Sequence, residues 1–191
     1  RARRGEPPVD PLYTFEDAEI ACDLFTPVEY NHTFEVTNGV NVTYVDSGHI
    51  LGSASIILDI NENGNKKRLW FSGDIGRDRL PLLKDPIMPV NADYLIMECT
   101  YGDKNHRDPE TAYLEFREVT MKTIERGGKI IIPAFAVGRT QELVYFLNQM
   151  MAANDIPPIP IYVDSPLAVN ASDIFKKYAF LFDEETKRFI Q

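Results

Sequence analysis

The sequence predicts an α/β fold in two consecutive parts, and two patterns along the chain support this class. In the first part, apolar and polar residues alternate from Thr33 to about Phe71, as in strands with one buried face. After Gly102, segments with helical spacing alternate with short apolar runs, which is typical of a parallel sheet with crossover helices. We therefore divide the chain into residues 1–104 and residues 105–191.

The first part is predicted to contain one short helix followed by strands. Residues 9–26 carry an apolar stripe at helical spacing, and Thr14 with Asp17 resembles a capping box. The dipeptide Asn63-Gly64 is a hairpin signal between two strands. Two more strands are expected over residues 68–71 and 91–97.

The second part is predicted to alternate between helices and strands. Asp108-Pro109 is a helix start, since an acidic cap precedes a proline at the first helical position, and Gly127 is a natural stop. Helices are also expected over residues 140–151 and from Ser165 onward. The strands of this part are expected at residues 129–132 and 159–163.

The composition limits the classes of function. The 191 residues carry a net charge of −9 and show no dense basic patch, whereas proteins that bind phosphate backbones usually offer one. Binding of nucleic acid would depend on a local groove, on metal ions or on segments outside these residues. We expect no membrane partner and a cytoplasmic location, because no long apolar run or signal peptide is visible. Cys22 and Cys99 lack a zinc-binding spacing and are expected to be reduced and buried.

Two residues at strand ends indicate metal chemistry. His49 lies between Gly48 and Gly52, which let the backbone turn sharply and come close to a metal ion. An imidazole is a good zinc ligand, and the carboxylate of Asp74 could bridge two cations. Taken alone, His49 could be a hydrogen-bonded loop residue and Asp74 a turn residue. Their occurrence together favours the metal interpretation.

Five segments carry a resemblance to a known family. Gly48–Ala54, Ser72–Arg77 and Glu98–Asp103 resemble three successive motifs of the metallo-β-lactamase superfamily, and more narrowly of its β-CASP nucleases. Pro133–Glu142 and Asp164–Ala168 are similar to segments of the cap domain of those enzymes. The resemblance implies part of an αββα metallo-β-lactamase sandwich, followed by part of an α/β β-CASP cap domain with a parallel sheet.

The resemblance also implies roles for individual residues. His49 would be a zinc ligand and Asp74 the bridging ligand and a catalytic residue. Glu98 would orient a histidine that acts on the leaving group, which is sound chemistry for a carboxylate.

Two helix starts are candidates for binding substrate. Arg139 and Thr140 begin one helix and Ser165 begins the next, so each could contact a phosphate of RNA. Plain helix capping remains open as the role of Ser165.

The resemblance further implies that the paired-histidine motif of the family lies upstream of residue 1, and that its later histidines lie beyond Gln191. We therefore expect two zinc ions in the complete enzyme, and an inactive chain with absent or weakly bound metal when these residues stand alone. Open strand edges would leave room for a homodimer.

The function that follows is cleavage of single-stranded RNA by a metal-activated water, as an endonuclease or a 5′-exonuclease. Three alternatives stay open at this point. They are a small-molecule hydrolase of the same superfamily, a non-catalytic scaffold subunit, and a module that only binds RNA.

Overall fold

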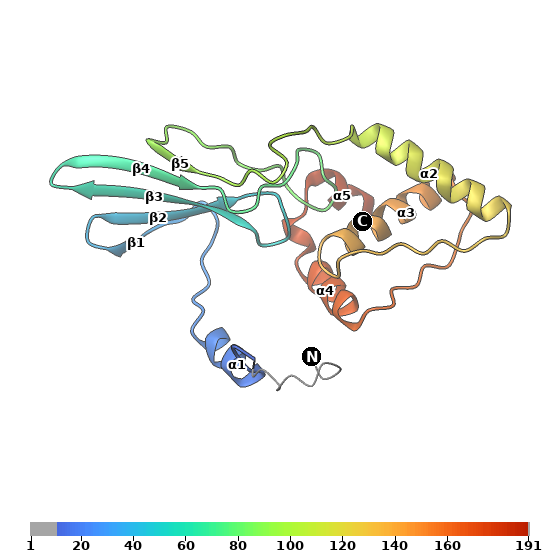
Figure 1. Cartoon of the computed structure of the whole chain (residues 1–191), viewed down its shortest axis with the longest axis horizontal. Helices are drawn as coiled ribbons and strands as arrows, with labels where there is room; N and C mark the ends of the chain where they lie inside the picture. The colour runs from blue at the N-terminus through green and yellow to red at the C-terminus, as the bar shows by residue number, and fades with distance from the viewer. Residues whose placement is uncertain (1–10, 191) are drawn as a thin grey trace, which may run out of the picture.

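The alternating segments of the first part pair into one five-stranded sheet in the order β1-β2-β3-β4-β5. The computed structural model describes residues 11–190, and it places this sheet beside a group of helices (Figure 1). The strands are β1 (Thr33–Thr37), β2 (Val40–Asp46), β3 (Ala54–Glu62), β4 (Asn65–Phe71) and β5 (Tyr94–Ile96).

Strands β1 to β4 form an antiparallel meander, and β5 adds to β4 in parallel. The turn between β3 and β4 is confirmed at Asn63 and Gly64, which have φ values of 53° and 83°. Positive φ at both central residues gives the turn type whose twist matches the flanking strands.

The pairing pattern brings three loops together at one edge of the sheet, the edge formed by the carboxyl ends of β2, β4 and β5. The loop from β2 to β3 leaves and re-enters at the pair Asp46 and Ala54. The carboxyl ends of β4 and β5 lie side by side, at Phe71 and Ile96. Segments that follow these strand ends therefore start close together.

Apolar side chains of the sheet form a small core of its own. Val45, Ile57 and Trp70 are buried against one another, with Ala92 packed beside them. Trp70 is only 2% exposed. An aromatic ring of this size dominates the energetics of so small a cluster.

The second part consists of helices, three of which begin within one residue of the expected starts. Asp108 caps the first of them through a hydrogen bond from the N–H of Thr111 at 2.9 Å, and proline follows at the first helical position. The helices are α2 (Pro109–Glu125), α3 (Arg139–Ala152), α4 (Pro166–Lys177), the short 3-10 helix η2 (Ala179–Leu181) and α5 (Glu184–Ile190).

The two parts share a core across the expected boundary. Leu82, from the loop between β4 and β5, packs with Tyr145 of α3, Phe175 of α4 and Phe182. The N–H of Leu82 also donates to the hydroxyl of Thr186 in α5 at 2.9 Å. Leu82 has a φ of 72°, which is costly for a leucine. These contacts hold the helices against the end of the sheet (Figure 1).

The α/β class is confirmed, but several local predictions are wrong. Residues 129–132 and 159–163 form no strand, since no neighbouring segment of residues 11–190 pairs with them. Ile131 and Tyr162 are 91% and 85% exposed there, so apolar composition alone did not produce a sheet. A strand needs a hydrogen-bonding partner as well as apolar side chains.

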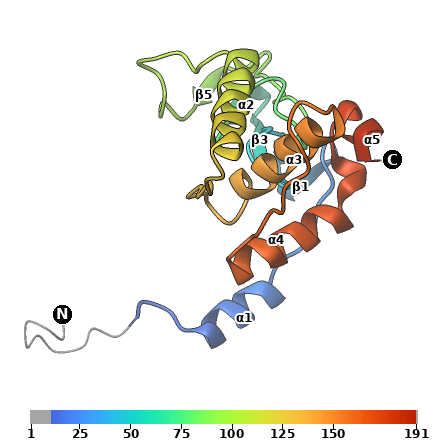
Figure 2. The same cartoon turned by 90° about the vertical axis from the view of Figure 1, so that its right-hand side faces the viewer.

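The helix expected over residues 9–26 is shorter, and its residues 9 and 10 lie outside the described part. It spans α1 (Phe15–Asp23), and the capping box of Thr14 and Asp17 is confirmed. No residue of α1 is buried, and the helix stands away from the sheet (Figures 1 and 2).

The prediction of buried cysteines is also wrong, because Cys22 and Cys99 are both exposed thiols. Among residues 11–190, no helix has the length and apolar character that crossing a membrane requires.

Candidate functional site

The loop that carries His49 is built by local hydrogen bonds. Asp46 ends β2, and its carboxylate accepts a bond from the N–H of Gly48 at 2.9 Å. The hydroxyl of Ser53 accepts bonds from the N–H groups of His49 and Ile50, at 3.1 and 3.2 Å. These bonds fix the backbone on both sides of the imidazole.

The loop after β4 packs directly against the His49 loop. The N–H of Gly76 donates to the carbonyl of Ser47 at 2.8 Å. A Cβ atom added at Gly76 would lie 1.7 Å from the carbonyl oxygen of Gly48, so only glycine fits. This contact brings His49 Nε2 within 3.8 Å of Asp74 Oδ2. Their side chains are 44% and 75% exposed, so both are accessible to a ligand.

Glu98 follows β5 and joins the same cluster. Its Oε1 accepts a hydrogen bond from the N–H of Ile75 at 2.7 Å, and its second oxygen accepts one from the hydroxyl of Thr100. Its own N–H donates to Ser72 Oγ at 3.1 Å. The bonds from Thr100 and Ile75, with a smaller contribution from the charge of His49, lower the pKa of Glu98. Glu98 is therefore a carboxylate at neutral pH.

The donor atoms suit a metal ion, although they are too few to hold one firmly. An imidazole nitrogen and a carboxylate oxygen are both normal zinc ligands, and zinc takes three or four protein ligands as a rule. Within residues 11–190, no group of three histidine, cysteine or acidic side chains is placed to hold a metal. His49 and Asp74 therefore fit as part of a metal centre that other residues would complete.

The start of α3 lies against the His49 loop. A Cβ atom added at Gly138 would come within 3.4 Å of Ile50 Cγ2. The next residue, Arg139, donates from Nη1 to Glu142 Oε2 at 2.7 Å. The arginine side chain is 58% exposed and that of Glu142 only 10%. Because a guanidinium has five N–H donors, this bond orients Arg139 and leaves other donors for an anion.

The backbone N–H groups at the start of α3 are less available to an anion than we expected from the sequence, because they already donate hydrogen bonds. The N–H of Arg139 donates to Val137 O at 3.2 Å, and the N–H of Thr140 donates to Phe135 O at 3.3 Å. The hydroxyl of Thr140 donates to the same carbonyl at 2.7 Å. Any anion contact here would therefore fall mainly on the side chain of Arg139.

Ser165 begins α4 as expected and acts as its cap. Its hydroxyl accepts a hydrogen bond from the N–H of Ala168 at 3.2 Å. Capping is thus shown for Ser165, and substrate contact stays a prediction.

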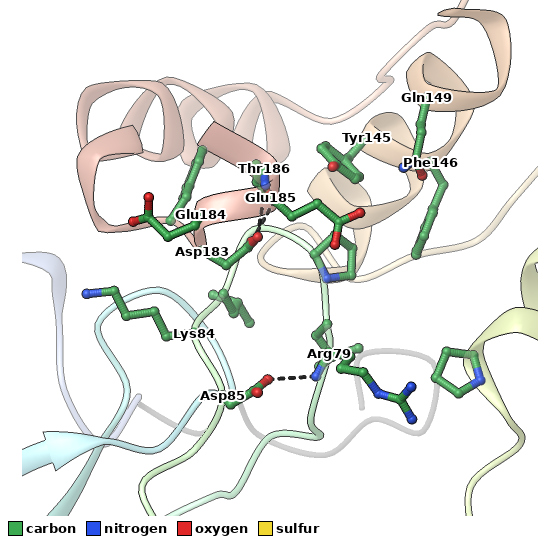
Figure 3. Close-up of a pocket in the computed structure, with 15 residues that line it drawn as sticks. Arg79, Lys84, Asp85, Tyr145, Phe146, Gln149, Asp183, Glu184, Glu185 and Thr186 are labelled. Atoms are coloured by element: carbon green, nitrogen blue, oxygen red, sulfur yellow. Dashed lines mark hydrogen bonds between the residues drawn. The ribbon is translucent and has the colours of Figure 1, made fainter. Parts of the chain in front are cut away.

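A cavity of about 480 Å³ lies elsewhere, between the loop after β4 and helices α3 and α5 (Figure 3). The N–H of Arg79 donates to Asp85 on its lower side at 2.7 Å, while Tyr145 and Glu185 line the helical side. Neither His49 nor Asp74 lines this cavity. It is separate from the candidate metal site.

Several known proteins are similar to this chain over most of its length. The Beta-Casp domain family matches residues 140–191. The chain is 34% identical to "Ribonuclease TTHA0252" of Thermus thermophilus, covering 93% of this chain and 40% of that protein. It is 32% identical to an "RNase J-like protein" of Methanocaldococcus jannaschii, covering 94% and 42%. It is 31% identical to "Cleavage and polyadenylation specificity factor subunit 3-I" of Arabidopsis thaliana, covering 93% and 25%.

These matches support the β-CASP nuclease group of the metallo-β-lactamase superfamily. Members of this group are metal-dependent. The chain spans about 40% of the length of the first two relatives named above.

Several residues that shape this β-CASP site were not expected from the sequence. Ser53 and Gly76 hold the two loops together, and Tyr30 donates to the carbonyl of Ser53 at 2.7 Å. Gln141 links α3 to α4. The sequence offered one signal, because Ser53, Gly76 and Gln141 lie inside the motifs named above. Tyr30 and Gln141 act through partners more than 20 residues away.

Proposed function

We propose that the complete protein containing this chain is a metal-dependent hydrolase that cleaves single-stranded RNA. The observation that carries this proposal is the meeting of His49, Asp74 and Glu98 at one edge of the sheet. His49 Nε2 and Asp74 Oδ2 lie 3.8 Å apart and would supply two metal ligands. Glu98 accepts a hydrogen bond from the backbone N–H of Ile75, the residue after Asp74. Two of the relatives, named as a ribonuclease and as an RNase J-like protein, support the reaction class.

The metal is proposed to be a pair of zinc ions, for which Asp74 would serve as a common ligand. When bound, such ions supply a water of lowered pKa for attack on phosphorus. His49 and Asp74 would hold and orient the metal centre at the edge of the sheet. Their nitrogen and oxygen donors suit zinc.

Glu98 is proposed to orient a histidine that gives its proton to the leaving oxygen. A carboxylate that accepts the N–H of an imidazole fixes its tautomer and holds the ring in place. The lowered pKa of Glu98 keeps it charged for this role at neutral pH. Its bonds to Ile75 and Thr100 hold the carboxylate in place.

The RNA strand is proposed to pass the starts of α3 and α4. Arg139 is exposed and oriented by Glu142, so its remaining donors can contact a phosphate. Such a local contact would offset the acidic character of the chain, whose net charge is −9. Thr140 and Ser165 are proposed to contribute weaker polar contacts.

The test uses the complete protein, its zinc content and its cleavage of an end-labelled single-stranded RNA. The expected result is two zinc ions and cleavage in the parent, with both reduced in Asp74→Ala. Asp78→Ala is the matched control, because Asp78 is an exposed carboxylate of the same loop. A zinc-free, inactive parent would favour a scaffold subunit. A parent that hydrolyses thioesters or lactones but leaves RNA intact would favour a small-molecule hydrolase.

A further inference from the structure

Gln141 is a buried amide whose hydrogen-bonding capacity is almost fully used. It is the third residue of α3 and is 7% exposed. Its Oε1 accepts one bond, and three acceptors surround its Nε2. Because a side-chain amide has two N–H donors, three acceptors around them leave neither donor unpaired. A buried amide satisfied in this way fixes the segments that it touches.

One set of these bonds holds the turn before Arg139. Gln141 Oε1 accepts from the N–H of Gly138 at 2.8 Å, and Nε2 donates to Ala136 O at 3.1 Å. Gly138 has a φ of 82°, so this turn depends on a conformation that other residues rarely adopt. The direction in which Arg139 leaves the helix start therefore depends on Gln141.

The other set reaches the first turns of α4. Nε2 of Gln141 donates to Ala168 O at 3.3 Å and to Ser172 Oγ at 3.0 Å. Ser172 in turn donates to Ala168 O at 2.8 Å. Ala168 is the residue whose N–H is capped by Ser165. One side chain thus connects the turn that carries Arg139 with the helix start that carries Ser165.

We propose that Gln141 is a positioning residue for RNA binding, which sets the spacing and direction of the α3 and α4 starts relative to each other. This inference rests on the proposed function, in which Arg139 and Ser165 contact the RNA strand. Gln141 itself is buried and touches no substrate. Its effect is on the binding of RNA, through Arg139, and not on the metal centre.

The test is Gln141→Glu in the complete protein. Glutamate has the same shape and keeps an acceptor for the N–H of Gly138, but it places an oxygen where Nε2 faced the carbonyls of Ala136 and Ala168. We expect KM for single-stranded RNA to rise about tenfold, the size of effect that loss of one well-placed hydrogen bond produces. The value of kcat is expected to stay within about twofold of the parent value, because the lost contact stabilises the bound substrate and the transition state equally.

A second readout separates positioning from general damage. If Arg139 no longer contacts a phosphate of the RNA, the slope of log KM against the logarithm of the salt concentration should fall by about the contribution of one phosphate contact. A merely structural role would lower the unfolding midpoint without changing this slope. Asn148→Asp is the matched control, since it makes the same amide-to-acid change on an exposed position of α3.

Ser172→Ala keeps the test decisive if Gln141→Glu does not fold. It removes only the bond from Gln141 to Ser172 and the bond from Ser172 to Ala168, and we expect a rise in KM of about two- to fivefold with unchanged kcat. The inference would be overturned if the parent cleaves RNA and a folded Gln141→Glu variant has the KM and salt slope of the parent. The same result for Ser172→Ala would also overturn it. A parent that does not cleave RNA at all would instead overturn the proposed function.

Discussion

Glu98 Oε1 accepts a hydrogen bond from the backbone N–H of Ile75 at 2.7 Å. This bond ties the segment after β5 to the segment after β4, one residue from Asp74. The parallel pairing of the two strands makes it available, because parallel neighbours end at the same edge. The carboxylate is thereby fixed near the proposed metal ligands.

Glu98→Gln should therefore separate the charge of this residue from its structural role. The amide oxygen can still accept from the N–H of Ile75, so folding and metal content should match the parent. Loss of the negative charge should lower RNA cleavage roughly 10- to 100-fold, as loss of a carboxylate that orients a histidine does. Glu110→Gln, at an exposed position in the first turn of α2, is the control. Parent-like cleavage by Glu98→Gln would contradict the role proposed for Glu98.

Gly76→Ala should damage the metal site although it changes no polar group. The added methyl group would meet the carbonyl oxygen of Gly48 at 1.7 Å, so the loops that carry His49 and Asp74 must separate. We expect loss of bound metal and of cleavage, measured by elemental analysis and RNA assay. Gly64→Asn is the control, because nothing lies within 4 Å of a Cβ there and asparagine tolerates positive φ. Normal metal content in Gly76→Ala would show that this contact does not set the site.

At Leu82, the glycine variant should not be less stable than the alanine variant, in contrast to the usual order of the two. Leu82→Ala removes a buried side chain and should cost about 2–5 kcal/mol of unfolding free energy. Leu82→Gly also loses the Cβ atom but relieves the strain at φ 72°, so it should be no less stable than Leu82→Ala. At the buried Leu83, which is not among the residues with positive φ, glycine should be about 0.5–1 kcal/mol less stable than alanine. Denaturant unfolding measures all four variants, and the same order at both positions would contradict the strain at Leu82.

The fold was predictable where the signal lies within a few residues. The turn at Asn63 and Gly64 and the start of α2 at Asp108 were expected and are present. Both depend on local backbone preference and on hydrogen bonds that span three residues. Residues 129–132 were not predictable in this way, since their apolar run matches a strand but no segment of residues 11–190 pairs with them.

The same distinction separates the predicted from the missed parts of the site. His49, Asp74 and Glu98 were expected from motifs that directly follow strands, and the strand pairing brings them together. Leu82 and Gln141 were not expected. Leu82 meets Thr186 across 104 residues, and Gln141 meets Ser172 across 31. No pattern along the sequence encodes a contact of that range.

Tyr30 should make the protein lose stability in alkaline solution. Partial burial, and to a lesser degree the negative charge of Asp46, raise the pKa of Tyr30 to about 12. The unfolded chain has the ordinary tyrosine pKa of about 10, so both states carry a neutral Tyr30 below that pH. Above about pH 10 the unfolded state ionises first, and stability falls until the folded state ionises as well. The sign follows from the raised pKa of an acid, whose neutral form the fold favours.

Tyr30→Phe should remove this part of the alkaline loss. At neutral pH the variant should be about 0.5–1.5 kcal/mol less stable, because it lacks the hydrogen bond to the carbonyl of Ser53. The gap between parent and variant should then narrow as the pH rises above about 10. Tyr13→Phe, at a position 73% exposed, is the control and should leave the pH dependence of the parent unchanged. Urea unfolding over this pH range tests the prediction, and a constant gap for Tyr30→Phe would show that Tyr30 titrates alike in both states.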